Sequence, residues 1–118
     1  MAFVQTLGGT EQVIVAGSFT DNIDTVRGTG YSVAHSGGVY TITLDRAYNG
    51  LISFAATIMN PDMASGEALV PILSAHSITD GTTGGTLTMK VIDDAGNIET
   101  TVATNCEIFF IAVLDVDT

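Results

Sequence analysis

Basic side chains are almost absent from this chain. Arg27, Arg46 and Lys90 stand against thirteen acidic residues in 118, and the formal net charge is −10. A protein that binds DNA or RNA needs clustered Lys and Arg to replace the counterions that the nucleic acid releases. Anionic membrane surfaces also attract basic segments rather than acidic ones. The charge balance therefore predicts that neither nucleic acid nor a membrane is a partner.

Cysteine and long apolar runs are also lacking. Cys106 is the single cysteine, so an internal disulfide or a cage of several thiolates is excluded. It precedes Glu107, Ile108 and Phe109 rather than the cationic residues that activate a thiol, and we expect an unreactive core residue. No window reaches the roughly 18 apolar residues that a membrane span requires. Met1-Ala2-Phe3 does not resemble the start of a secretory leader, so we expect synthesis in a cytoplasm.

Charge of either sign is scarce. Charged residues make up 14% of the chain, against about 25% in an ordinary soluble domain, while hydrophobic residues reach 46%. One interpretation is that part of the surface contacts other subunits. The alternative is that an all-β domain rich in Thr and Gly shows part of the same bias.

The pattern that remains is typical of an all-β protein, because short alternating runs are separated by clusters of Gly, Asn and Asp. Ser36-Gly37-Gly38 predicts a hairpin turn between two such runs. Asn60-Pro61-Asp62 offers at most one helical turn. The expected strands are 12–16, 31–35, 39–44, 51–59, 69–78, 86–92, 98–103 and 108–114. We predict one all-β domain, a single β-sandwich with jelly-roll-like or Greek-key topology and little or no helix.

The last expected strand is apolar on both faces. Its even-numbered residues suit the core, and its odd-numbered residues are then left facing outward. The outward residues are Phe109, Ile111 and Val113. A strand that is apolar on both faces must be covered on both. The outer cover is either another subunit or a loop of the same chain.

The first ten residues are expected to act as an arm, and residues 11–118 as the sandwich domain. Phe3 and Val4 favour β structure, and Gly8-Gly9 forms a joint before the first expected strand. We predict that the arm adds a strand to a neighbouring protein, which is another copy of the chain or a different partner. The alternative is that this segment pairs with the sheet of its own domain. The predicted interface residues are Phe3, Val4, Phe109, Ile111 and Val113.

No residues have the spacing of a catalytic or metal site. Residues 21–24 and 93–97 carry Asp and Asn, but neither stretch matches a calcium loop, and such residues are common in ordinary turns. His35 and His76 lie far apart in sequence, without a Glu or Cys at ligand spacing. We therefore expect no catalytic residues, no metal site and no cofactor, and a protein that is not an enzyme.

Two stretches carry a resemblance. Residues 28–48 read GTGYSVAHSGGVYTITLDRAY and residues 108–114 read IFFIAVL. Both resemble passages of small decoration (cement) proteins on the capsids of tailed bacteriophages. The layout is also similar to trimeric phage-fibre and C1q-like heads. The resemblance implies a structural protein on the capsid surface of a virion, synthesised in the host cytoplasm. Its implied partners are copies of itself, as a homotrimer, and the major capsid protein. The alternative is a fibre- or spike-type module that recognises a receptor or carbohydrate.

Overall fold

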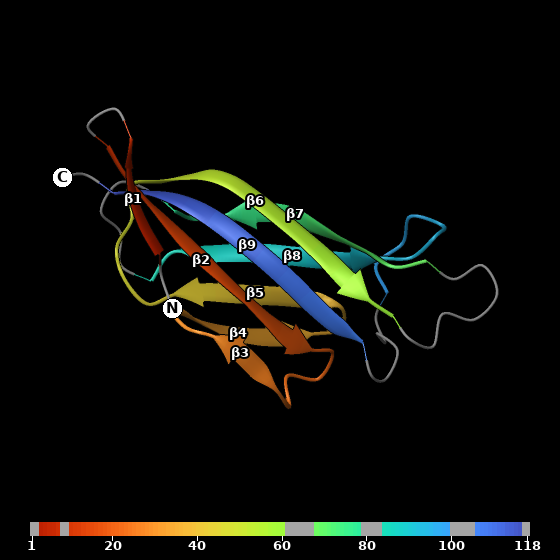
Figure 1. Ribbon diagram of the computed structural model, residues 1–118. Helices are drawn as coiled ribbons and strands as arrows, with labels where there is room; N and C mark the ends of the chain where they lie inside the picture. Colours follow the sequence, from red (N-terminus) through yellow and green to blue (C-terminus); the bar gives the residue numbers. More distant parts are fainter. Residues whose placement is uncertain (1–2, 8–9, 61–67, 79–83, 100–105, 117–118) are drawn as a thin grey trace.

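The computed structural model describes residues 3–7, 10–60, 68–78, 84–99 and 106–116, with residues 3–7 and 10 described by their backbone only. Nine strands in these ranges form two antiparallel sheets (Figure 1). Sheet A runs in the order β1 (Phe3–Leu7), β2 (Thr10–Thr20), β9 (Glu107–Val116) and β6 (Gly50–Met59), and β3 (Val26–Gly28) also pairs with β2. Sheet B runs in the order β4 (Tyr31–Ser36), β5 (Val39–Leu44), β8 (Thr86–Ile92) and β7 (Val70–His76).

Strands from the first half of the chain pair with strands from its second half. In sheet A β2 pairs with β9, and in sheet B β5 pairs with β8, so strands far apart in sequence are neighbours in both sheets. Such nested antiparallel pairs, divided between two packed sheets, are a feature that this sandwich shares with jelly rolls. The predicted all-β sandwich is therefore confirmed. The described residues contain no helix, and hence none that is long and apolar enough to cross a membrane.

The hairpin predicted at Ser36-Gly37-Gly38 joins β4 to β5. Ser36 pairs with Val39, which leaves Gly37 and Gly38 as a two-residue loop. Their φ angles are 53° and 82°. Two consecutive positive φ angles define the type I′ turn, whose twist matches that of the flanking strands. Glycine reaches this region without steric cost, which explains the pair at this position.

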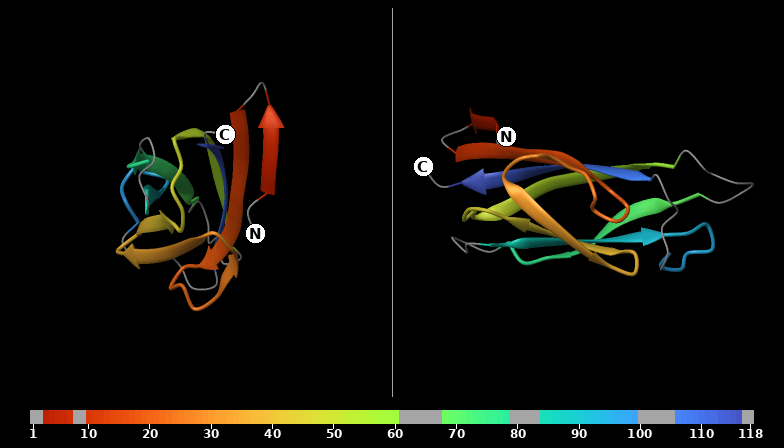
Figure 2. Two further views of the ribbon diagram at one scale, coloured as in Figure 1. Left: turned by 90° about the vertical axis from the view of Figure 1, so that its left-hand side faces the viewer. Right: turned by 90° about the horizontal axis from the view of Figure 1, so that it is seen from below.

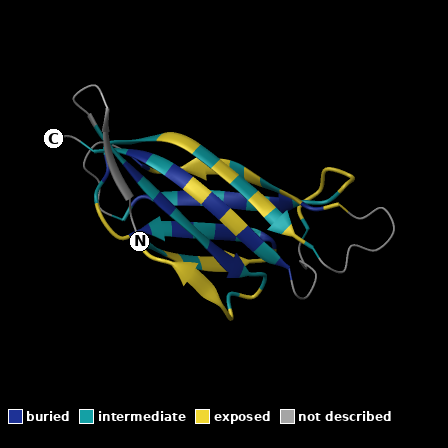
Figure 3. Ribbon diagram, in the orientation of Figure 1, coloured by how far each residue is buried: buried dark blue, intermediate teal, exposed yellow. Residues whose placement is uncertain are grey.

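The hydrophobic core lies between the two sheets and follows the alternation of the strands (Figure 3). In β5, β8 and β9 every second residue is buried, which is the period expected of strands with one face in a core. Tyr40 lies in this core, and its hydroxyl reaches the loop after β2, where it donates to the carbonyl oxygen of Asp21 at 2.6 Å. The even-numbered residues of β9 between 108 and 114 are buried as predicted. They are Ile108, Phe110, Ala112 and Leu114.

One expectation differs from the structure, and two fall mostly outside its described part. Alternation along residues 51–59 predicts that Ile52 shares a face with Phe54. A register shift between Leu51 and Ser53 instead leaves the Ile52 side chain 50% exposed. The bulge inserts one residue and reverses the face of Ile52. Of the strand expected at 98–103, the structure describes only residues 98 and 99, where Ile98 forms a bridge with Ile92; residues 100–103 lie outside the described part, so this expectation stays a prediction. The expected helical turn also falls mostly outside the described part, at residues 61–62.

The N-terminal segment pairs with its own chain. β1 lies antiparallel to β2, with Phe3 opposite Ile14 and Val4 opposite Val13. In Figure 2 it stands at the margin of sheet A, where β2 is its only partner among the described strands. Pairing with its own sheet is the alternative that the sequence leaves open beside a free arm. Addition of the segment to a neighbouring protein stays a prediction.

Candidate interaction surface on sheet A

The outer face of sheet A is formed by residues of β2, β9 and β6 that alternate with the core residues. The strand register aligns them in three rows across the sheet. We call these nine residues the outer strip. They are Ser18, Phe109 and Thr57 in the first row, Ala16, Ile111 and Ala55 in the second, and Ile14, Val113 and Ser53 in the third.

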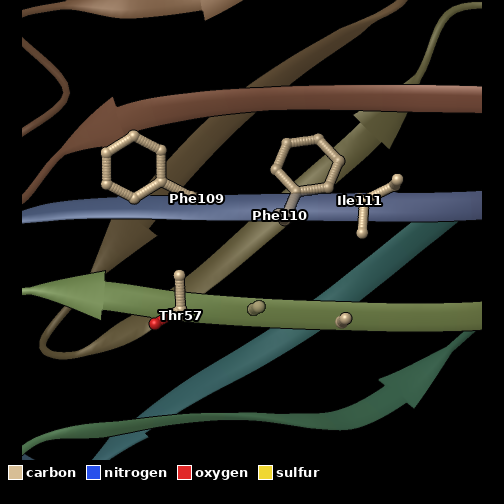
Figure 4. Close-up of a pocket in the computed structure, with 6 residues that line it drawn as sticks. Thr57, Phe109, Phe110 and Ile111 are labelled. Carbon is tan, nitrogen blue, oxygen red and sulfur yellow. The ribbon is translucent and has the colours of Figure 1, made fainter.

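The outer strip has a ridge and a groove. Phe109 and Ile111 on the central strand β9 are 39% and 41% exposed. On the neighbouring strand β6 the same rows hold only Thr57 and Ala55. Between the large and the small side chains lies an open groove of about 310 Å³ (Figure 4). Its lining residues are Ala55, Ala56, Thr57, Phe109, Phe110 and Ile111.

The groove rests on a packed aromatic cluster. Phe110, which points into the core, contacts the ring of Tyr31 edge-on at a centroid distance of 4.8 Å. It also stacks against Phe54 at 6.1 Å and lies 6.3 Å from Phe19. Aromatic packing of this kind restricts side-chain movement beneath the strand. The base of the groove at Phe110 is therefore held in place.

Charge lies at the two ends of the strip and not within it. At one end Ser18 Oγ donates to Glu107 Oε2 at 2.7 Å, and Arg27 Nε lies 3.7 Å from the same oxygen. At the other end Asp115 faces outward, and its Oδ1 is buried without a hydrogen-bond partner among the described residues. None of the nine strip residues is charged. A partner can therefore cover the strip without burying a charge.

The chemistry of the groove is that of an apolar contact surface. Thr57 supplies its only polar side chain, and small-molecule sites usually combine an apolar lining with several convergent polar groups. Within the described ranges, no three side chains among His, Cys, Asp and Glu come together as a metal site. The groove has no group placed for acid–base or nucleophilic catalysis.

The acidic turns are held by local hydrogen bonds. Asp93 Oδ1 accepts from the backbone N–H groups of Ala95 and Asn97, both at 2.9 Å. In the other turn Asn22 Oδ1 accepts from the backbone N–H of Asp24 at 3.3 Å. These bonds are typical of Asx turns, in which the side chain fixes the backbone.

The two histidines and the cysteine lie apart from the groove lining. His35 stacks on Tyr40 at a centroid distance of 5.5 Å, and His76 Nδ1 accepts from the backbone N–H of Ile78 at 3.4 Å. Cys106 is fully buried and its Sγ donates to Asn60 Oδ1 at 3.4 Å. These three side chains therefore serve local packing and hydrogen bonding.

The structure brings three of the predicted interface residues together. Phe109 and Ile111 are exposed and Val113 is half-buried, all on β9. Phe3 shares the row of Val113 through Ile14, whereas Val4 stands opposite the core residue Val13. Sequence reasoning missed the contribution of Ala55 and Thr57, although small residues alternating with core residues along β6 are visible in the sequence. Their role depends on β6 lying beside β9.

Comparisons with family models, with curated proteins and with solved structures find no match to this chain.

Proposed function

We propose that this protein is a structural component of a bacteriophage virion, a capsid decoration protein that assembles with copies of itself and binds the major capsid protein. The observation that carries the proposal is β9, which is apolar on both faces and leaves Phe109 and Ile111 exposed at the centre of a sheet. Contiguous apolar surface of this kind marks protein–protein contacts.

The surface chemistry supports a role that depends on contact area. The outer strip has no charge, and its groove has a single polar side chain. A stable interface buries about 800 Å² on each partner. A decoration protein needs such surface and needs no reacting group. The net charge of −10 also suits a protein that does not touch the nucleic acid inside a particle.

The test uses antibody raised against the purified chain to label gradient-purified virus particles from the source of the sequence. We expect immunogold electron microscopy to show many copies distributed over the capsid. As a second readout, mass spectrometry of the same particles should detect the chain in stoichiometric amounts. Label absent from all particles would overturn the proposal.

The same images separate the decoration role from the alternative of a fibre or spike module. A fibre or spike protein is present in a few copies, so its label would gather at the tail or at one vertex. Label confined in that way would replace the decoration role with receptor or carbohydrate recognition.

A further inference from the structure

We infer that the outer strip binds a second copy of this chain, with the Phe109–Ile111 ridge of one copy seated in the groove of the next. This inference rests on the proposed structural role and specifies the surface that makes the self-contact. Three observations support a copy of the same chain as the occupant: the relief of the strip, its lack of charge and its size.

The relief is self-complementary. The ridge consists of Phe109 and Ile111 on β9. The groove beside it has only the small residues Ala55, Ala56 and Thr57 on its β6 side. Residues two apart on a strand are separated by about 7 Å, which leaves room for one side chain between the two ridge residues. One copy therefore offers both the large side chains and the space that large side chains need. Contacts of ridge to groove close into a ring of three copies or pair two copies, according to the rotation between neighbours.

The charge pattern favours an uncharged occupant. Each chain has a net charge of −10, but the acidic groups next to the strip are at its ends, on Glu107 and Asp115. Glu107 is already bonded to Ser18 and lies near Arg27. A basic partner would find no acidic residue among the nine of the strip, and the Glu107 carboxylate that reaches Ser18 already has Arg27 beside it. A second copy brings another uncharged strip. The net negative charges of the two chains still repel each other at long range, and salt screens this repulsion.

The area approaches what a stable contact needs. The three strands of the strip are 11, 10 and 10 residues long. At about 3.4 Å per residue and about 4.8 Å per strand, the full outer face of these strands, including the rows of Glu107 and Asp115 beyond the strip, covers roughly 490 Å² in projection. This is more than half of the roughly 800 Å² that each partner buries in a standard interface. Met59, 47% exposed on β6, extends the apolar surface beyond the first row.

The experiment compares matched substitutions by sedimentation of the full chain at micromolar concentration. Ile111→Asp places a charge on the ridge, and Ile72→Asp is its control, since Ile72 has a similar exposure of 43% but lies on β7 of sheet B. Ala55→Leu fills the groove, and Ala34→Leu is its control at an exposed alanine of β4. Circular dichroism checks the fold of each variant.

We expect an oligomer for the unmodified chain and for both controls. Ile111→Asp should raise the dissociation constant at least about a hundredfold, because it buries an unpaired charge. Ala55→Leu should raise it at least about tenfold by overfilling the groove. Association should strengthen as salt is raised, because the Debye length falls from about 10 Å at 0.1 M to about 3 Å at 1 M.

Each contrary result has a defined meaning. A folded monomer in the unmodified chain, or dissociation by Ile72→Asp and not by Ile111→Asp, would overturn the inference. Association that weakens with salt would show a contact made by opposite charges and would also overturn it. If Ile111→Asp does not fold, the comparison of Ala55→Leu with Ala34→Leu still decides. Labelled particles together with a monomeric chain would leave the binding to the capsid in place, and would remove both the self-assembly in the proposed function and this inference.

Discussion

The hydroxyl of Tyr31 occupies the space that a side chain at Gly17 would need. A Cβ built on Gly17 would overlap Tyr31 Oη and approach the carbonyl oxygen of Arg27 to 2.5 Å. The same hydroxyl lies 2.6 Å from the Arg27 carbonyl oxygen and 3.2 Å from that of Ser18, and it donates its hydrogen to them. The ring of Tyr31 meets Phe110 under the groove. Tyr31 on β4 thus forms hydrogen bonds to β2 and β3, and its ring packs against Phe110 beneath the outer strip.

The first prediction concerns Gly17. Gly17→Ala should lower the free energy of unfolding by about 1–3 kcal/mol, because the added methyl has to displace Tyr31 and a backbone carbonyl. Gly50→Ala is the control, since a Cβ there meets nothing within 4 Å. It should leave stability unchanged or raise it by up to about 1 kcal/mol. Urea unfolding measures both, and equal effects would contradict the close approach of Tyr31.

The second prediction separates two tyrosine hydroxyls. Tyr31→Phe should cost about 0.5–1.5 kcal/mol, because it removes the donor to the Arg27 and Ser18 carbonyl groups. Tyr48→Phe should cost nothing or stabilise the fold, because the Tyr48 hydroxyl is buried without a hydrogen-bond partner in the described part of the chain. Thermal unfolding of the two variants gives the comparison. A larger loss in Tyr48→Phe than in Tyr31→Phe would reverse this assignment.

The third prediction concerns alkaline pH. Burial, helped by the nearby Asp21 and Cys106, raises the pKa of Tyr40 from 10.0 to about 12. The unfolded chain therefore loses this proton more readily than the folded chain does. The free energy of unfolding should be unaffected by Tyr40 below about pH 10 and should fall as the pH rises towards 12.

Burial also raises the pKa of Tyr31 and Tyr48, so they contribute in the same direction. Urea unfolding at several pH values, with phenolate absorbance as a second readout, tests this dependence. Tyr40→Phe should make the fall shallower. Stability that stays constant up to about pH 12 would contradict it.

The fourth prediction concerns metal. The acidic turns use their side-chain oxygens in local hydrogen bonds, as Asp93 does with Ala95 and Asn97. A chelator should therefore leave the melting temperature unchanged, and elemental analysis of the purified chain should find no stoichiometric calcium or zinc. One metal ion per chain, or one per three chains, would contradict this expectation.

The fifth prediction concerns the N-terminal segment. We expect deletion of residues 2–7 to abolish attachment to undecorated particles while the sandwich still folds, because the core as described begins at Val13. A full-length variant with Phe3→Ser and Val4→Ser separates the side chains from the backbone pairing of β1. Folding is followed by circular dichroism and attachment by co-sedimentation. Loss of the fold, or attachment that does not change, would show that the segment does not act as an arm.

Sequence reasoning found the strands and their faces because alternation is a local property. The runs at 39–44 and 86–92 alternate with a period of two, and their buried residues are those that the period assigns. Gly37 and Gly38 indicated the hairpin because two consecutive positive φ angles strongly favour glycine. The alternation failed at Ile52, where a bulge that no local signal marked reversed its face.

The sequence alone determined that this protein is an acidic, all-β domain whose last strand is apolar on both faces. Only the tertiary structure decided that β9 lies between β2 and β6, since pairs such as Glu11 with Val116 join opposite ends of the chain. Many alternating strands satisfy the same local rules, and the choice of neighbours depends on how the whole set packs. The groove beside Phe109 and Ile111 follows from that choice, because small residues form a groove only where a strand of large residues lies next to them.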